Sequence, residues 1–161
     1  MRKELEHKLI ERWPTWFNTG GDIRNTAMPL GFQHGDGWFD ILWRLCEDLE
    51  PLVAEFEVAG GPKFEVLQVK EKFGGLRFYV NCRNDNDAIR HRILAAQEES
   101  FHTCEVCGQP GRLRREGRSI KTLCDEHASE EEKQVMAELT HAQLWPAQTA
   151  RLCGLYLCIS V

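Results

Sequence analysis

The length, composition and charge of the chain exclude several classes of protein before any motif is considered. With 161 residues, 42% of them hydrophobic, the chain is long enough for one main core and too apolar to be disordered. Its net charge of −5 argues against indiscriminate nucleic-acid binding. No run of about eighteen apolar residues and no signal-peptide pattern occurs, so we expect a cytoplasmic protein without a membrane span.

The N-terminal region predicts a short helix followed by a turn-rich segment. Residues 2–11 have apolar side chains at helical spacing among charges, and a proline soon ends the pattern. The rings that follow, Trp13, Trp16 and Phe17, are expected to pack in a core because each buries a large area. Residues 18–35 are rich in glycine and contain a proline, and they therefore predict turns.

A second, longer helix is predicted to begin near Gly37. Its apolar residues recur at intervals of three and four positions and are Trp38, Ile41, Leu42, Leu45, Leu49 and Leu52. Pro51 is expected to kink or end this helix. Asp36 is interpreted as a helix-start residue, and His34 has no nucleophile or second ligand beside it that would indicate catalysis.

The middle of the chain predicts a β-hairpin. Residues 64–70 and 76–80 are rich in β-formers and are separated by a glycine-containing turn. In the second strand, alternation predicts that Arg77 lies on the face opposite to the apolar residues. Lys70, Lys72 and Arg77 gather near the turn, where they form either a solvated hairpin end or a contact for phosphate or an acidic partner.

The most informative pattern follows a third predicted helix at residues 89–101. Cys104 and Cys107 are separated by two residues, as are Cys124 and His127 after a gap of sixteen. Two pairs of soft ligands at this spacing predict a closed, tetrahedral Zn²⁺ site. The ion would be structural, because protein side chains fill all four positions. A redox Cys-x-x-Cys or buried thiols would not require the second pair.

The residues between the two ligand pairs predict a β-hairpin. Gly108 allows a tight turn after the first pair, and further glycines and a proline mark turns around a short basic run. Thr122 is expected to cap a helix that presents Cys124 and His127 on one face. Turn, hairpin and ligand-bearing helix together predict a treble-clef-like zinc finger.

The remaining residues predict one more helix and an apolar segment. Ser129 to Glu132 has the pattern of a capping box for a helix that runs to about Leu144. Residues 152–161 are apolar and suit either a final strand or a buried arm of a homo-oligomer. Four cysteines outside the motif are expected to be reduced thiols, namely Cys46, Cys82, Cys153 and Cys158.

The predicted elements define an α+β fold in which helices pack on a β-hairpin or small antiparallel sheet. We expect an α+β main domain at residues 1–100 and the treble-clef-like finger with its following helix at residues 101–145. The apolar C-terminal segment then comprises residues 146–161.

Four segments of the chain resemble a known group of proteins. The segments are Gly35 to Trp38, Gln68 to Tyr79, Thr103 to Gly108 and Thr122 to Ala128. Together they are similar to small uncharacterised zinc-finger (CxxC…CxxH) proteins of bacteria, phages and mobile elements, over about residues 1–128. The resemblance implies a bacterial or phage setting and a metal finger, and it implies no particular activity.

We expect a zinc-stabilised, non-enzymatic binding protein. It would be a factor of a phage or mobile element that engages a protein of the host. Nucleic-acid binding through the finger hairpin at residues 112–121 is an alternative. Five basic residues against Glu116 support this alternative, namely Arg112, Arg114, Arg115, Arg118 and Lys121.

An enzyme is the least favoured class. The zinc-deaminase pattern needs a ligand-x-Glu motif upstream of the cysteine pair, and none is present. An HNH-like nuclease would need a catalytic histidine beside a vacant metal position, for which only His91 and His102 are candidates. We therefore predict no catalytic residues.

Overall fold

The computed structural model describes residues 1–82, 86–116 and 118–128. The predicted helix at residues 129–144 and the apolar segment at residues 146–161 lie outside these ranges. Within them, no helix is both long and apolar enough to cross a bilayer.

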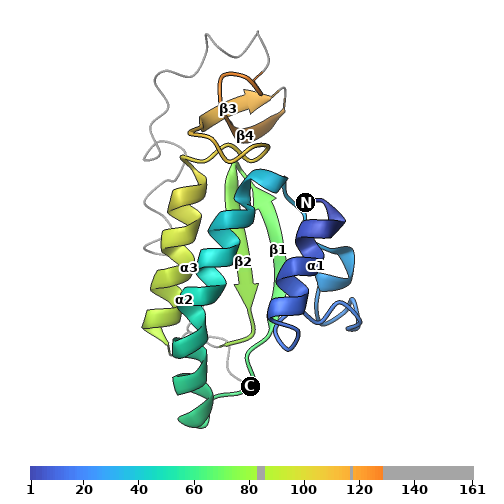
Figure 1. The fold of residues 1–161 in the computed structure, drawn as a ribbon, viewed down its shortest axis with the longest axis vertical. Helices are drawn as coiled ribbons and strands as arrows, with labels where there is room; N and C mark the ends of the chain where they lie inside the picture. Colours follow the sequence, from blue (N-terminus) through green and yellow to red (C-terminus); the bar gives the residue numbers. More distant parts are fainter. Residues whose placement is uncertain (83–85, 117, 129–161) are drawn as a thin grey trace.

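The described residues form an α+β fold, as predicted (Figure 1). The long helices are α1 (Lys3–Arg12), α2 (Phe39–Val58) and α3 (Asp87–Ser100), and two 3-10 turns are η1 (Met28–Leu30) and η2 (Asp36–Trp38). One antiparallel hairpin pairs β1 (Val66–Lys72) with β2 (Gly75–Val80), and a second pairs β3 (Arg112–Glu116) with β4 (Ser119–Leu123). Figure 1 places the second hairpin at one end of the molecule, beyond the ends of α3 and the first hairpin.

The main core lies between α1, α2, α3 and one face of the β1–β2 hairpin. Trp13, Trp16 and Phe17 are buried in it, which confirms their expected role in packing. From β1 and β2, Val69 and Phe78 face this core, as the alternation of a half-buried strand requires.

Pro51 does not end its helix, contrary to one of the two expected outcomes. Helix α2 continues to Val58 with Pro51 inside it. Leu49 and Val53, on either side of the proline, are both buried in the core. Their packing offsets the backbone hydrogen bond that proline cannot form, and the proline ring itself is exposed.

The turn of the first hairpin has the two-residue form that suits the twist of antiparallel strands. Phe73 and Gly74 both have positive φ, at 55° and 76°, as a type I′ turn requires. The turn-rich segment before η2 runs along the outer edge of β1, where Gln33 N–H donates to the carbonyl of Val69 and Glu71 N–H donates to that of Gln33, both at 2.9 Å. The edge of β1 is therefore covered by the chain itself.

His34 is a buried histidine at the end of this segment. Its side chain stacks on Trp38, with ring centroids 5.7 Å apart, and its residue is 6% exposed. Nδ1 lies 2.8 Å from the carbonyl oxygen of Gly35, so it carries the proton, while Nε2 is buried without a partner among the described residues. Burial lowers the pKa of His34 to about 4.

We predict that His34 makes the fold sensitive to acid. An unfolded chain protonates this histidine near pH 6.5, whereas the folded protein resists protonation until about pH 4, so stability falls as the pH drops through this window. The full loss is about 3 kcal/mol. Urea unfolding at several pH values should show that His34→Asn, which keeps a donor toward Gly35, loses less stability than the wild type. Equal pH dependence of the two proteins would contradict the assignment.

Candidate metal centre

Four side chains converge at the base of the second hairpin. The Sγ atoms of Cys104, Cys107 and Cys124 and a ring nitrogen of His127 all lie within 4.8 Å of one another. The Cys107 and Cys124 sulfurs are 3.7 Å apart, and Cys104 Sγ is 3.8 Å from His127 Nδ1. Two thiolates on one tetrahedral ion at 2.3 Å would be roughly 3.8 Å apart, so the cluster fits a four-coordinate metal ion.

The first ligand pair sits on a tight turn. Gly108 N–H donates to the carbonyl of Cys104 at 2.9 Å, and Cys104 N–H donates to that of Gln109 at 2.8 Å. Gly108 has a φ of 78°, a conformation that glycine adopts without steric cost. This turn, residues 104–108, is called the knuckle below. It confirms the predicted use of Gly108.

The second ligand pair sits on a turn after β4, and the predicted capping role of Thr122 is wrong. Thr122 lies within β4, and its hydroxyl donates to the carbonyl of Gly74 at 2.6 Å, so it is used to join the two hairpins. Residues 125–127 form a turn in which Ala128 N–H donates to the carbonyl of Cys124 at 3.1 Å. The turn still brings Cys124 and His127 together, because residues three apart in a helical turn share a face.

The environment of Cys124 favours the form that binds metals. Its Sγ lies 3.1 Å from His127 Nδ1, and this contact lowers the pKa of the Cys124 thiol to about 6. The contact therefore favours the thiolate, the form of cysteine that acts as a ligand. Cys104 and Cys124 are buried, whereas Cys107 and His127 are exposed.

The knuckle docks on the segment from Gly35 to Trp38, just before α2. Gly37 N–H donates to the carbonyl of Glu105 at 2.8 Å, and the indole N–H of Trp38 donates to that of Thr103 at 2.8 Å. A Cβ on Gly37 would lie 2.1 Å from the Cys104 carbonyl oxygen, so only glycine permits this approach. Gly35 and Gly37 therefore allow close contact with the knuckle, in addition to the turn before α2.

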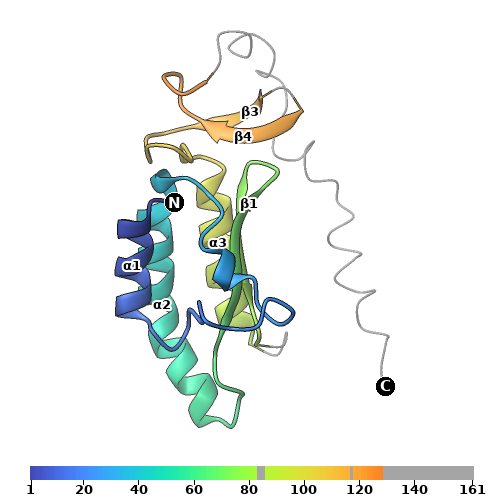
Figure 2. The ribbon, with the colours of Figure 1, turned by 90° about the vertical axis from the view of Figure 1, so that its right-hand side faces the viewer.

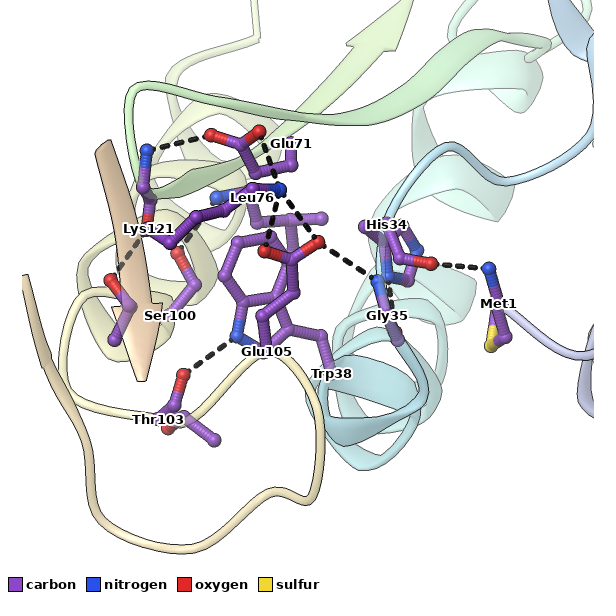
Figure 3. Close-up of polar contacts among 12 residues, drawn as sticks. Met1, His34, Gly35, Trp38, Glu71, Leu76, Ser100, Thr103, Glu105 and Lys121 are labelled. Carbon is purple, nitrogen blue, oxygen red and sulfur yellow. Dashed lines mark hydrogen bonds and ion pairs between the residues drawn. The ribbon is translucent and has the colours of Figure 1, made fainter. Parts of the chain in front are cut away.

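A partly buried ionic network, in which only Glu105 is fully buried, holds the same junction together (Figure 3). The carboxylate of Glu105, inside the knuckle, accepts from Gly35 N–H at 3.1 Å and from Lys121 Nζ at 2.9 Å. Lys121 also pairs with Glu71 at 2.9 Å, and Glu71 accepts from Gly74 N–H at 2.7 Å. Burial opposes the charge on Lys121, but the two carboxylates prevail and raise its pKa. One lysine thus joins the finger to the first hairpin.

The basic residues proposed for nucleic-acid contact are largely occupied within the finger. Arg114 is only 2% exposed, where Nε donates to the Leu123 carbonyl at 3.0 Å and the guanidinium pairs with Asp125. Arg112 pairs with the same carboxylate at 3.3 Å, and Lys121 belongs to the network above. Arg115 and Arg118 are exposed. The hairpin therefore presents fewer free charges than its sequence suggests.

The structure brings together the four side chains that the sequence predicts as ligands, but the sequence does not predict the residues that dock them. The sequence predicts no role for Glu105, places Lys121 in a basic run, and gives Gly37 only as the start of a helix. The signal available for these roles was the pair of glycines beside a tryptophan, because two glycines flanking one residue can mark a close backbone approach.

The fold and the cluster define a small α+β protein with a candidate Cys₃His metal centre docked against its main core. Comparison of the chain with family models, with curated proteins and with solved structures finds no match.

We predict that Gly37→Ala weakens both the junction and the metal centre. The added methyl group would collide with the Cys104 carbonyl oxygen, 2.1 Å from the Cβ position, and forcing the two apart should cost about 2 kcal/mol. Competition with a coloured chelator should show weaker metal binding than in the wild type. Gly20→Ala is the control, because no atom lies within 4 Å of its Cβ position. Equal metal affinity of both variants would contradict the docking role of Gly37.

Proposed function

We propose that the cluster binds Zn²⁺ as a structural ion in a treble-clef-like finger. The observation that carries this proposal is the convergence of three sulfurs and one imidazole nitrogen within 4.8 Å. This donor set suits Zn²⁺ because softer thiolate and imidazole ligands favour it over Mg²⁺ or Ca²⁺. Since the chain supplies four ligands, a tetrahedral ion keeps no position for a reacting water.

The protein then acts by binding another macromolecule, and we favour a protein partner over catalysis. The ion pair of the buried Glu105 with the partly buried Lys121 supports this view, because it uses charged groups to fix the second hairpin and the knuckle on the core. A rigid junction of this kind presents a preformed surface, which reduces the entropy lost on binding. The resemblance to bacterial, phage and mobile-element proteins suggests a host protein in the bacterial cytosol as the partner.

We predict that the purified chain carries close to one zinc ion and that the ligands are specific. Elemental analysis should find zinc in the wild type and in Cys82→Ser, and a large loss in Cys124→Ser. Cys82 is a suitable control because it lies outside the cluster. Cobalt substitution should give the intense visible absorption of a tetrahedral thiolate site. Wild-type protein without a stoichiometric metal would refute the structural ion.

We predict that the intact chain captures a protein partner from bacterial lysate. Capture should survive nuclease treatment, and Cys124→Ser should capture less because the finger loses its shape without the ion. Nucleic acid alone in the captured fraction would favour the finger hairpin as a nucleic-acid site. Magnesium-dependent cleavage of DNA or RNA that disappears in His91→Ala or His102→Ala would instead favour the nuclease class.

A further inference from the structure

The β1–β2 hairpin has a second face that the main core does not use. The register places Gln68 opposite Tyr79 and Lys70 opposite Arg77, and Lys72 follows Lys70 on the same side. We call these five residues the outer face; Arg77 is buried beside the Phe101 ring, and the other four are partly or fully exposed. None of them carries a carboxylate. Figure 2 shows α1 and α2 on the other side of the hairpin.

Two lysines of the outer face have charges available for a partner. In the described part of the chain, Lys70 and Lys72 contact aromatic rings and no carboxylate, with Nζ 5.6 Å from the Tyr79 ring centroid and 5.2 Å from that of Phe73, respectively. Tyr79 and Phe73 are themselves 41% and 65% exposed. A strip of positive charge beside exposed rings is therefore open along the hairpin.

The outer face ends in a shallow hollow of about 340 Å³ between the hairpin and residues 23–27. Ile23, Ala27 and Leu67 line it together with the ring of Tyr79. Arg24 also lines the hollow, but it pairs with Asp22 at 2.5 Å, so that its charge is compensated. The hollow thus suits an apolar side chain better than an anion.

The hollow and the two lysines follow one another at the spacing of an extended chain. Gln68, beside the hollow, is followed by Lys70 and Lys72 at intervals of two residues, so the three positions span roughly 13 Å at the rise of a strand. An extended peptide that lies along β1 would present its own alternate side chains at the same intervals. An apolar residue would enter the hollow, and acidic residues two and four positions away would meet the lysines.

We propose that the outer face binds an extended, acidic segment of a partner protein, anchored by one apolar side chain in the hollow beside Tyr79. This inference rests on the proposed protein-binding function and names the surface and the chemistry of its partner. A single-stranded nucleic acid is less well matched, because tight binding of a phosphate backbone requires more than two lysines on a chain of net charge −5.

A synthetic peptide tests the proposal directly. The probe carries one leucine with glutamates at the second and fourth positions on either side, so that both chain directions are sampled. Fluorescence anisotropy with the metal-loaded full chain should show saturable binding that weakens with salt. Replacing the glutamates by glutamine, or the leucine by glycine, should weaken binding by roughly tenfold, the change expected when about 1.4 kcal/mol of contacts is lost.

Variants of the protein complete the experiment. Lys70→Gln/Lys72→Gln and, separately, Tyr79→Ser should each reduce peptide affinity by roughly tenfold. The controls are Lys8→Gln/Lys63→Gln, which removes two exposed lysines elsewhere, and Val58→Ser, which removes a 90% exposed apolar side chain. Both controls should bind like the wild type, and zinc content and circular dichroism should show that every variant is folded.

Three results would overturn the proposal. The first is equal affinity for the glutamine and glutamate peptides. The second is a loss of peptide affinity in the control variants as large as the loss in Lys70→Gln/Lys72→Gln or Tyr79→Ser. The third is tighter binding of an oligothymidylate of matched charge than of the peptide. Failure of this surface is distinguishable from failure of the protein-binding function. If Lys70→Gln/Lys72→Gln still captures the lysate partner, only the surface is wrong, whereas no captured protein with any variant refutes the function.

Discussion

The close approach of Gly37 to the knuckle is the constraint on which the rest of the structure depends. A side chain at this position would meet the carbonyl of Cys104, one of the four converging residues, at 2.1 Å. The residues around this position, Gly35 to Trp38, lead into α2. The indole N–H of Trp38 donates to the carbonyl of Thr103, and Gly35 N–H donates to the carboxylate of Glu105. Ligand geometry and the start of the core helix are therefore parts of one packed unit.

In this arrangement, a metal ion bound at the cluster would stabilise the main core as well as the second hairpin. Glu105 lies between two ligand positions in sequence, yet its carboxylate contacts Lys121 and, through it, Glu71 of the first hairpin. Such a buried carboxylate is stable only while its partners remain in place. An ion that fixes Cys104 and Cys107 therefore also fixes groups outside the finger, which is how a metal site can stabilise a larger fold.

Local patterns in the sequence predicted most helices and strands. Contacts with residues far away in the chain account for the differences between the expected and the observed structure. Alternation predicted the β1–β2 hairpin and the side on which Arg77 lies, but the ring of Phe101, 5.9 Å away, buries that side chain. The continuation of α2 through Pro51 depends on core packing, and the role of Thr122 depends on the carbonyl of Gly74, 48 residues away in the chain. The convergence of the four Cys and His side chains was predictable because their spacing is itself a local pattern.

The junction has a consequence for the order in which the chain can fold. The contacts that close it join residues far apart, with 70 positions between Gly35 and Glu105 and 65 between Trp38 and Thr103. Closing loops of this length early is entropically unfavourable, and β4, with the second ligand pair after it, is synthesised later still. During synthesis, the segment from Gly35 to Trp38 is therefore made long before the knuckle that packs on it, and longer still before Cys124 and His127.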